Sequence, residues 1–146
     1  MAYELRPYAP GDVLAIEVQP DQRGELIEGW RDQRRTRQPK GPALSLLSDG
    51  QARICGGIEP ITPWRGYFWL LASEGVGASG WGKVMRAGRQ LLDESRHHRI
   101  ESVANAEVGR FARFLDKLGL HREAVMRRYG AAGEDFALYA ITKEAV

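Results

Sequence analysis

The stretch YFWLLASEGVGASGWGKVMRAGRQLL, residues 67–92, decides how the rest of this chain is interpreted. Its apolar start, 67–72, has the length and composition of a buried strand. Four glycines follow between positions 75 and 82, and a helical pattern begins after them. Strand, glycine loop and helix N-terminus are the local parts of a phosphate-binding site, because glycines let backbone N–H groups approach an anion. The same arrangement also serves as a plain strand-to-helix turn, so the surrounding chain has to decide between the two.

Length and composition describe one ordinary domain. The 146 residues are 43% hydrophobic and 27% charged, so we expect a single domain over residues 1–146 with one hydrophobic core. The net charge of +2 does not favour nucleic acid as a partner. No apolar run reaches the roughly 18 residues of a membrane span, and the N-terminus does not look like a signal peptide. We therefore expect no membrane association and a cytoplasmic protein.

Cysteine and histidine usage argues against a metal site. Cys55 is the only cysteine, so no internal disulfide can form, and its apolar surroundings predict a buried, inert thiol. His97 and His98 are adjacent, and adjacent side chains rarely converge on one ion, so we interpret them as part of an exposed turn. We expect no metal.

The chain before the glycine loop predicts a strand, two helices and an antiparallel meander. Asp12 and Asp21 are placed to cap the two helices. Asp49-Gly50 is a favoured pair for a type I′ turn, which needs positive φ at both central residues. Strands are expected over 3–8, 43–48, 51–58 and 67–71.

Two side-chain groups in this half have alternative interpretations. Five cations between Arg31 and Lys40 form the densest positive cluster, which suits either a solvated helix end or a rim that attracts an anionic ligand. Trp30, Trp64 and Trp69 suit either the core or an interface, and we expect the core.

The chain after the loop predicts a strand–helix–strand unit and a closing hairpin. Helices are expected up to residue 95 and over 107–118, where Gly119 sits as a C-cap. Strands are expected over 100–104, 122–129 and 136–141. The whole order predicts an α+β fold with a mixed, mostly antiparallel, twisted sheet of about six to seven strands and helices on both faces.

With this order in place, the chain resembles the GNAT superfamily of N-acetyltransferases, most clearly from residue 52 onward. The family's loop pattern, Arg/Gln-x-x-Gly-x-Gly/Ala, is similar to GASGWG at 77–82, although Gly77 stands where the family has arginine or glutamine. The family's helix ending is similar to RFLDKLGL at 113–120. The closing segment, 122–139, looks most like that of the small acetyltransferase-like proteins of bacteriophages.

The resemblance implies acetyl-CoA as cosubstrate and an unidentified primary amine, of a small molecule or a protein, as acceptor. It implies that the strand 67–71 splays at its end and binds the pantetheine arm, and that backbone N–H groups of Ser79 to Lys83 bind the pyrophosphate. The implied cofactor-binding residues are Leu70, Leu71, Ala72, Ser79, Gly80, Trp81, Gly82, Lys83 and Asn105. It places the protein in the cytoplasm of a bacterial or phage-infected cell and leaves a homodimer open.

The same resemblance leaves proton transfer without its usual residues. Val108 and Leu115 occupy the positions where many family members have an asparagine and a tyrosine acid, and Gly66 replaces a frequent acidic residue. The remaining candidates are Glu59 and Glu101 as bases and Tyr129 as acid, each of which also suits a surface or packing role. Two hypotheses follow: an active acetyltransferase, or a catalytically silent binding or phage virion-associated protein on the same scaffold.

Overall fold

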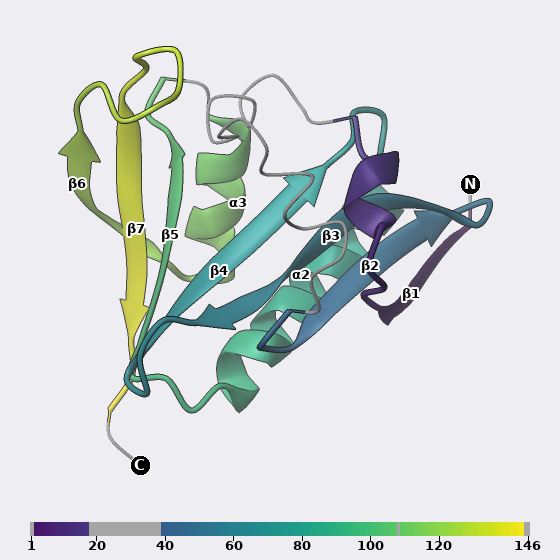
Figure 1. Ribbon diagram of the computed structural model, residues 1–146, viewed down its shortest axis with the longest axis horizontal. Helices are drawn as coiled ribbons and strands as arrows, with labels where there is room; N and C mark the ends of the chain where they lie inside the picture. Colours follow the sequence, from purple (N-terminus) through teal and green to yellow (C-terminus); the bar gives the residue numbers. More distant parts are fainter. Residues whose placement is uncertain (1, 18–38, 108, 145–146) are drawn as a thin grey trace.

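A seven-stranded mixed sheet forms the centre of the computed structural model, which describes residues 2–17, 39–107 and 109–144 (Figure 1). The strands are β1 (Tyr3–Pro7), β2 (Ala43–Ser48), β3 (Gln51–Pro60), β4 (Arg65–Ala72), β5 (Arg99–Asn105), β6 (His121–Met126) and β7 (Phe136–Thr142). They lie in the order β1-β2-β3-β4-β5-β7-β6, and every neighbouring pair is antiparallel except β4 and β5. The predicted α+β fold with a mostly antiparallel sheet is confirmed.

The hairpin between β2 and β3 forms as its turn residues predict. Asp49 has φ of 52° and Gly50 has φ of 74°, so both central residues adopt the left-handed conformation that a type I′ turn requires. The meander continues into β4, where Ile54 pairs with Ala72 and Pro60 with Gly66. The closing hairpin of β6 and β7 is also present, with a register shift between Arg122 and Ala124.

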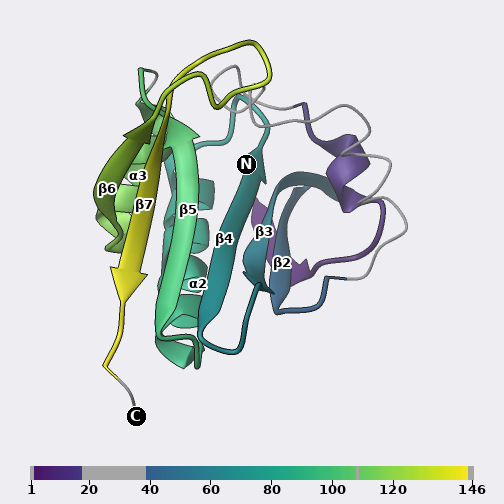
Figure 2. The ribbon, with the colours of Figure 1, turned by 60° about the vertical axis from the view of Figure 1, so that its left-hand side comes forward.

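Helical elements cover both faces of the sheet (Figure 2). They are the 3-10 helix η1 (Asp12–Ala15) and the α-helices α2 (Ala78–Glu94) and α3 (Arg110–Leu118). Side chains alternate along β4, so Phe68 and Leu70 pack with α2 and α3, while Trp69 and Leu71 pack with η1. No helix among the described residues is long and apolar enough to cross a membrane.

The two α-helices contact each other closely near the C-terminus of α3. A Cβ atom added at Gly88 would lie 3.0 Å from Cδ1 of Leu118, so glycine permits this approach. Gly119 ends α3 in the left-handed conformation with φ of 110°, as predicted for a C-cap glycine. The helix begins at Arg110 and is shorter than the predicted span 107–118.

The N-terminal segment differs from its prediction. Asp12 is the first residue of a short 3-10 helix rather than the cap of an α-helix, and Gly11 holds the N-cap position with φ of 97°. The carboxylate of Asp12 instead accepts two hydrogen bonds from the Arg6 guanidinium, at 2.8 and 2.9 Å, and further bonds from the Ala9 N–H and the Ser45 hydroxyl. Burial alone would raise the pKa of Asp12, but these donors outweigh it and hold that pKa below its usual value.

Two further predictions have different outcomes. The prediction that Trp64 belongs to the core is wrong, because its side chain is 63% exposed and contacts His98 edge-on, whereas Trp69 is buried as expected. The helix expected after Asp21, Trp30 and the cationic cluster from residue 31 to residue 38 lie outside the described residues. Lys40, the last cation of that cluster, is exposed.

Candidate functional site

The central feature of the site is an opening between β4 and β5. The two strands pair only over three residues each, from Arg65 opposite Arg99 to Tyr67 opposite Glu101. One step further, the Ser102 hydroxyl donates to the Phe68 carbonyl at 2.7 Å, and beyond this point the strands separate (Figure 1). Beyond Phe68, the edge of β4 that faces β5 therefore borders the opening and is not paired with β5.

The direction of the β4 backbone follows from strand alternation. The Ser73 N–H donates to Arg53 of β3, so residues 69, 71 and 73 direct their backbone groups toward β3. Phe68 and Leu70 consequently direct theirs toward β5 and the opening. Of the three strand residues predicted to bind a cofactor, Leu70 and Ala72 face this side through their backbone, whereas Leu71 faces β3.

A groove of about 450 Å³ adjoins the opening. Its walls come from β4, from the loop before α2, from the first turn of α2 and from α3. The lining residues are Leu70, Gly75, Val76, Trp81, Arg110, Phe111, Arg113, Phe114 and Lys117. The groove thus combines an apolar and aromatic surface with three cations, and no acidic side chain is among its lining residues.

The N-terminus of α2 lies at this groove and has unpaired donors by helix geometry. Its N-cap, Gly77, offers no side-chain cap, and no acidic residue lies in the first turn. The first helical hydrogen bond runs from the Trp81 N–H to the Gly77 carbonyl at 3.1 Å, so the N–H groups of 78–80 precede the first repeating bond. The Trp81 N–H, one of the predicted pyrophosphate donors, is thus engaged in the helix, and the binding roles of Ser79 to Lys83 stay predictions. The donor set moves to 78–80, at the positive end of the helix dipole.

Gly80 and Gly82 of this helix differ in their packing, and their predicted role in phosphate binding stays a prediction. A Cβ atom at Gly80 would lie 2.7 Å from Val76 Cγ1 and 3.2 Å from both Leu46 Cδ2 and Tyr3 Cδ2. Gly80 therefore faces the sheet, where it lets α2 approach β1 and β2. A Cβ atom added at Gly82 would have Nη1 of Arg86 as its nearest neighbour, at 3.5 Å, so no close contact requires glycine there.

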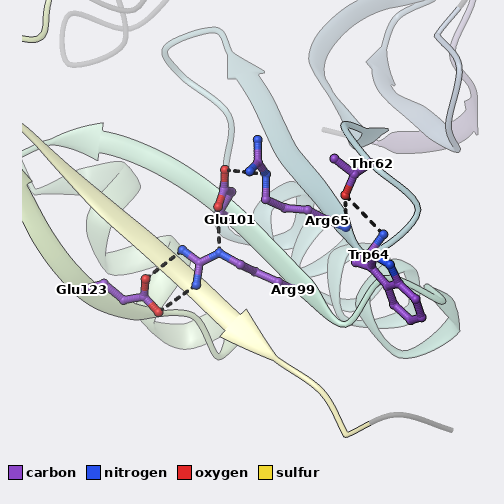
Figure 3. A network of polar contacts seen from close by, with 6 residues as sticks. All are labelled: Thr62, Trp64, Arg65, Arg99, Glu101 and Glu123. Carbon is purple, nitrogen blue, oxygen red and sulfur yellow. Dashed lines mark hydrogen bonds and ion pairs between the residues drawn. The ribbon is translucent and has the colours of Figure 1, made fainter.

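Glu101, a predicted base, lies in a network of charged side chains at the closed end of the opening (Figure 3). One carboxylate oxygen pairs with Nε of Arg99 at 2.8 Å and the other with Nε of Arg65 at 3.3 Å. Arg99 also donates two hydrogen bonds to Glu123, at 3.0 and 2.7 Å. The bonds that Arg99 donates to Glu123 hold the pKa of Glu123 below its usual value. Its bonds to Glu123 and Glu101 also raise the pKa of Arg99. The Arg65–Glu101 pair joins β4 to β5 where the opening begins, so Glu101 has a structural role, and its role as a base stays a prediction.

The other predicted proton-transfer residues lie apart from this network. Glu59, at the end of β3, accepts a hydrogen bond from the Lys40 N–H at 3.1 Å. Tyr129 is 53% exposed in the segment after β6 and contacts Phe136 edge-on. Leu115 is fully buried in the core, so this side of α3 carries no acid. The roles of Glu59 and Tyr129 stay predictions.

Asn105 and Lys83 complete the predicted cofactor residues. Asn105 is buried at the end of β5, and its Oδ1 accepts a hydrogen bond from the Glu107 N–H at 2.9 Å, which supports the chain as it leaves the strand. Lys83 lies in the second turn of α2 and is half-buried. Both stay predictions as ligands.

A thiol nucleophile or a metal centre does not fit the described part of the chain. Cys55 is fully buried, and burial raises its pKa to about 12, so the thiol is protonated and inaccessible as predicted. Across residues 2–17, 39–107 and 109–144, no group of three or more His, Cys, Asp or Glu side chains is placed to hold a metal ion.

Sequence reasoning missed the three cations of the groove, Arg110, Arg113 and Lys117. The sequence of this segment predicts a family signature and a helix with an apolar face. The signal was present, because cations separated by three and seven residues on a helix lie on one face. Only the structure shows that this face borders the opening.

Solved structures of several acetyltransferases share this fold. The chain is similar to Ard1 from Thermoplasma volcanium, with a TM-score of 0.75, 15% identity and 99% of each chain covered. It is similar to a ribosomal-protein alanine N-acetyltransferase from Escherichia coli, with a TM-score of 0.73, 12% identity, 99% of this chain covered and 96% of that one. A GNAT family acetyltransferase from Elizabethkingia anophelis with acetyl-CoA bound has a TM-score of 0.67, 11% identity, 97% of this chain covered and 98% of that one.

At these identities the likeness establishes the fold: the chain has the α+β fold of the GNAT acetyltransferases. No protein-family model matches the sequence, and no curated protein matches it significantly.

Proposed function

We propose that this protein is an acetyl-CoA-dependent N-acetyltransferase that transfers an acetyl group to a primary amine of a small molecule or a protein. The observation that carries the proposal is the groove of about 450 Å³ beside the opening between β4 and β5. The fold adds support, because the structures aligned over nearly the whole chain include an acetyltransferase with acetyl-CoA bound.

The residues of the groove fit coenzyme A, which joins a pantetheine arm of hydrocarbon and amide groups to three phosphate groups. Leu70, Phe111 and Phe114 offer apolar contacts for the arm, and the β4 backbone at Leu70 faces the opening. The uncapped N-terminus of α2 supplies the donors of 78–80 for a pyrophosphate. Because no acidic side chain lines the groove, a highly charged anion meets no repulsion there.

The chemistry of the cosubstrate leaves few tasks to the protein. Acetyl-CoA supplies an activated thioester, at which an amine nitrogen forms the C–N bond as the C–S bond breaks, the amine loses one proton and the sulfur gains one. Backbone N–H groups of β4 are suited to hold a developing oxyanion, and the groove is suited to fix the orientation of the reactants. Proton transfer is assigned to Glu59, Glu101 or Tyr129, or to water, since an amine also loses its proton to solvent.

A catalytically silent binding protein is the second candidate. It is favoured by the two ion pairs of Glu101 and by the buried leucine at position 115, which together leave the proton-transfer positions of the fold without a dedicated acid or base. A virion-associated role, a phage origin, a cytoplasmic location and a homodimer stay predictions.

One experiment separates the two candidates. Calorimetric titration with acetyl-CoA measures binding, and release of free thiol in the presence of a panel of amines and N-terminal peptides measures turnover. Ellman's reagent suits this assay, because the buried Cys55 contributes little background in the folded protein.

We expect both binding and amine-dependent thiol release. Binding without release for every amine tested supports the silent protein. The absence of binding at concentrations of about 1 mM, which corresponds to roughly 4 kcal/mol of affinity, contradicts the acetyltransferase.

A further inference from the structure

We propose that the cationic face of α3 recognises the 3′-phosphate of coenzyme A, so that the protein discriminates coenzyme A thioesters from their 3′-dephospho forms. The inference rests on the proposed function and deepens it. It assigns a ligand group to Arg110, Arg113 and Lys117, which the sequence interpretation did not connect with binding.

The three cations share one face of a short helix. At about 100° of rotation per residue, Arg113 lies about 300° and Lys117 about 340° around the helix axis from Arg110, so the three lie within an arc of roughly 60°. All three line the groove of about 450 Å³. The acidic neighbour Asp116 belongs to the same helix but is not among the lining residues.

The adjoining apolar face of α3 packs the helix into the core. Phe111, Phe114, Leu115 and Leu118 are buried in the core, and Leu118 packs against the glycine of α2 at position 88. This packing fixes the backbone positions from which the three cations extend, which suits a defined anion better than cations on a mobile segment do.

The cations have no anionic partner within the described residues. The ion pairs of this part of the chain all involve Arg6, Arg65 or Arg99, and none involves Arg110, Arg113 or Lys117. Three exposed cations along one wall repel each other, so an arrangement of this kind is favoured when an anion binds between them.

The two walls of the groove offer different donors, which suit different phosphate groups of coenzyme A. The first turn of α2 offers backbone N–H groups, which suit the pyrophosphate of the proposed ligand. A phosphate monoester is the remaining charge of coenzyme A and carries about 1.5 to 2 negative charges near neutral pH. Arginine binds such a group through two parallel N–H donors, and lysine adds a point charge.

The test compares acetyl-CoA with 3′-dephospho-acetyl-CoA by calorimetric titration at low and moderate salt. The variants are the pair Arg110→Gln with Arg113→Gln, and Lys117→Gln. Arg96→Gln is the matched control, because Arg96 is an exposed cation beyond the far end of α2, a helix of 17 residues and roughly 25 Å.

For the unsubstituted protein we expect acetyl-CoA to bind about tenfold or more tightly than the dephospho form, a preference that falls with added salt. The double variant should lose most of this preference and keep its affinity for the dephospho form, Lys117→Gln should lose part of it, and the control should keep it. Circular dichroism checks that each variant is folded, which the exposed positions of the three side chains favour.

The outcomes separate this inference from the proposed function. Equal affinity for the two ligands, or a preference that survives in the folded double variant, overturns the inference and leaves acetyl-CoA binding intact. If neither ligand binds the unsubstituted protein, the proposed function fails, and the inference that rests on it fails as well.

Discussion

Two glycines of α2, separated by one residue, are expected to respond differently to the same substitution. In Gly80→Ala the added methyl would lie 2.7 Å from Val76 Cγ1 and 3.2 Å from Leu46 Cδ2, inside the about 3.5–4.0 Å that carbon atoms prefer. Overpacking of this kind costs about 1–3 kcal/mol. The exchange of glycine for alanine in a helix returns about 0.5–1 kcal/mol, which offsets only part of that cost.

Gly82→Ala is the matched control, because it makes the same chemical change on the same helix. Its added methyl would meet its nearest neighbour, Nη1 of Arg86, at 3.5 Å, which is an ordinary contact. Gly82→Ala should therefore gain up to about 1 kcal/mol from helix propensity alone. The gain in helix propensity largely cancels between the two variants. The difference between their free energies of unfolding therefore reports the packing at Gly80, and it should be about 1–3 kcal/mol.

Urea unfolding followed by tryptophan fluorescence and circular dichroism measures this difference, provided that the m-value stays unchanged. Gly80→Ala should unfold at lower urea than the unsubstituted protein or close to it, and Gly82→Ala at higher urea. Gly80→Ala with stability equal to or greater than that of Gly82→Ala would refute the reasoning, because α2 would then not depend on a glycine where it crosses β1 and β2.

Three further predictions concern the core and the N-terminal ion pair. Asp12→Asn should destabilise the protein by about 1–3 kcal/mol, because a neutral amide loses the charged bonds to Arg6. The native pKa of Asp12 is lowered, so its contribution is present above the unfolded value of about 3.9 and is lost as the pH falls through the native value. Urea unfolding at pH 3–7 should show a larger loss of stability in the unsubstituted protein than in Asp12→Asn. Cys55 should be inert to Ellman's reagent at pH 8 and react fully in denaturant, and fast native reaction would contradict its burial. Phe114→Ala should cost about 3–5 kcal/mol in urea unfolding, because the ring is buried against three aromatic neighbours, and a cost under about 1 kcal/mol would contradict this packing.

The parts of the fold that could be predicted from the sequence are those set by local chemistry. Asp49-Gly50 specifies its turn because few residue pairs tolerate two positive φ angles, and Gly119 specifies the end of α3 for a similar reason. The apolar run at 67–72 predicted a buried strand, and β4 is covered on both faces. These signals depend on few neighbours, so they survive without knowledge of the tertiary structure.

The parts that could not be predicted depend on contacts between distant segments. The carboxylate of Asp12 has the residue type and spacing of a helix cap, but Arg6 and Ser45 compete for it, and Ser45 lies on another strand. Glu101 has the sequence environment of a free carboxylate, yet Arg65 and Arg99 engage both of its oxygens. In each case a long-range partner decides the role of a carboxylate that looks unengaged in the sequence.

The glycine loop itself combines causes that a sequence motif cannot separate. Gly75 has φ of 83° and is required by the backbone, Gly80 and Gly88 are required by close packing of α2, and none of these reasons involves an anion. What the structure offers an anion is the set of first-turn N–H groups at 78–80, together with the cations of α3, such as Arg113, on the facing wall. Affinity for a phosphate ligand should therefore follow the charges of α3 and the position of the helix start, and it should not follow the number of glycines.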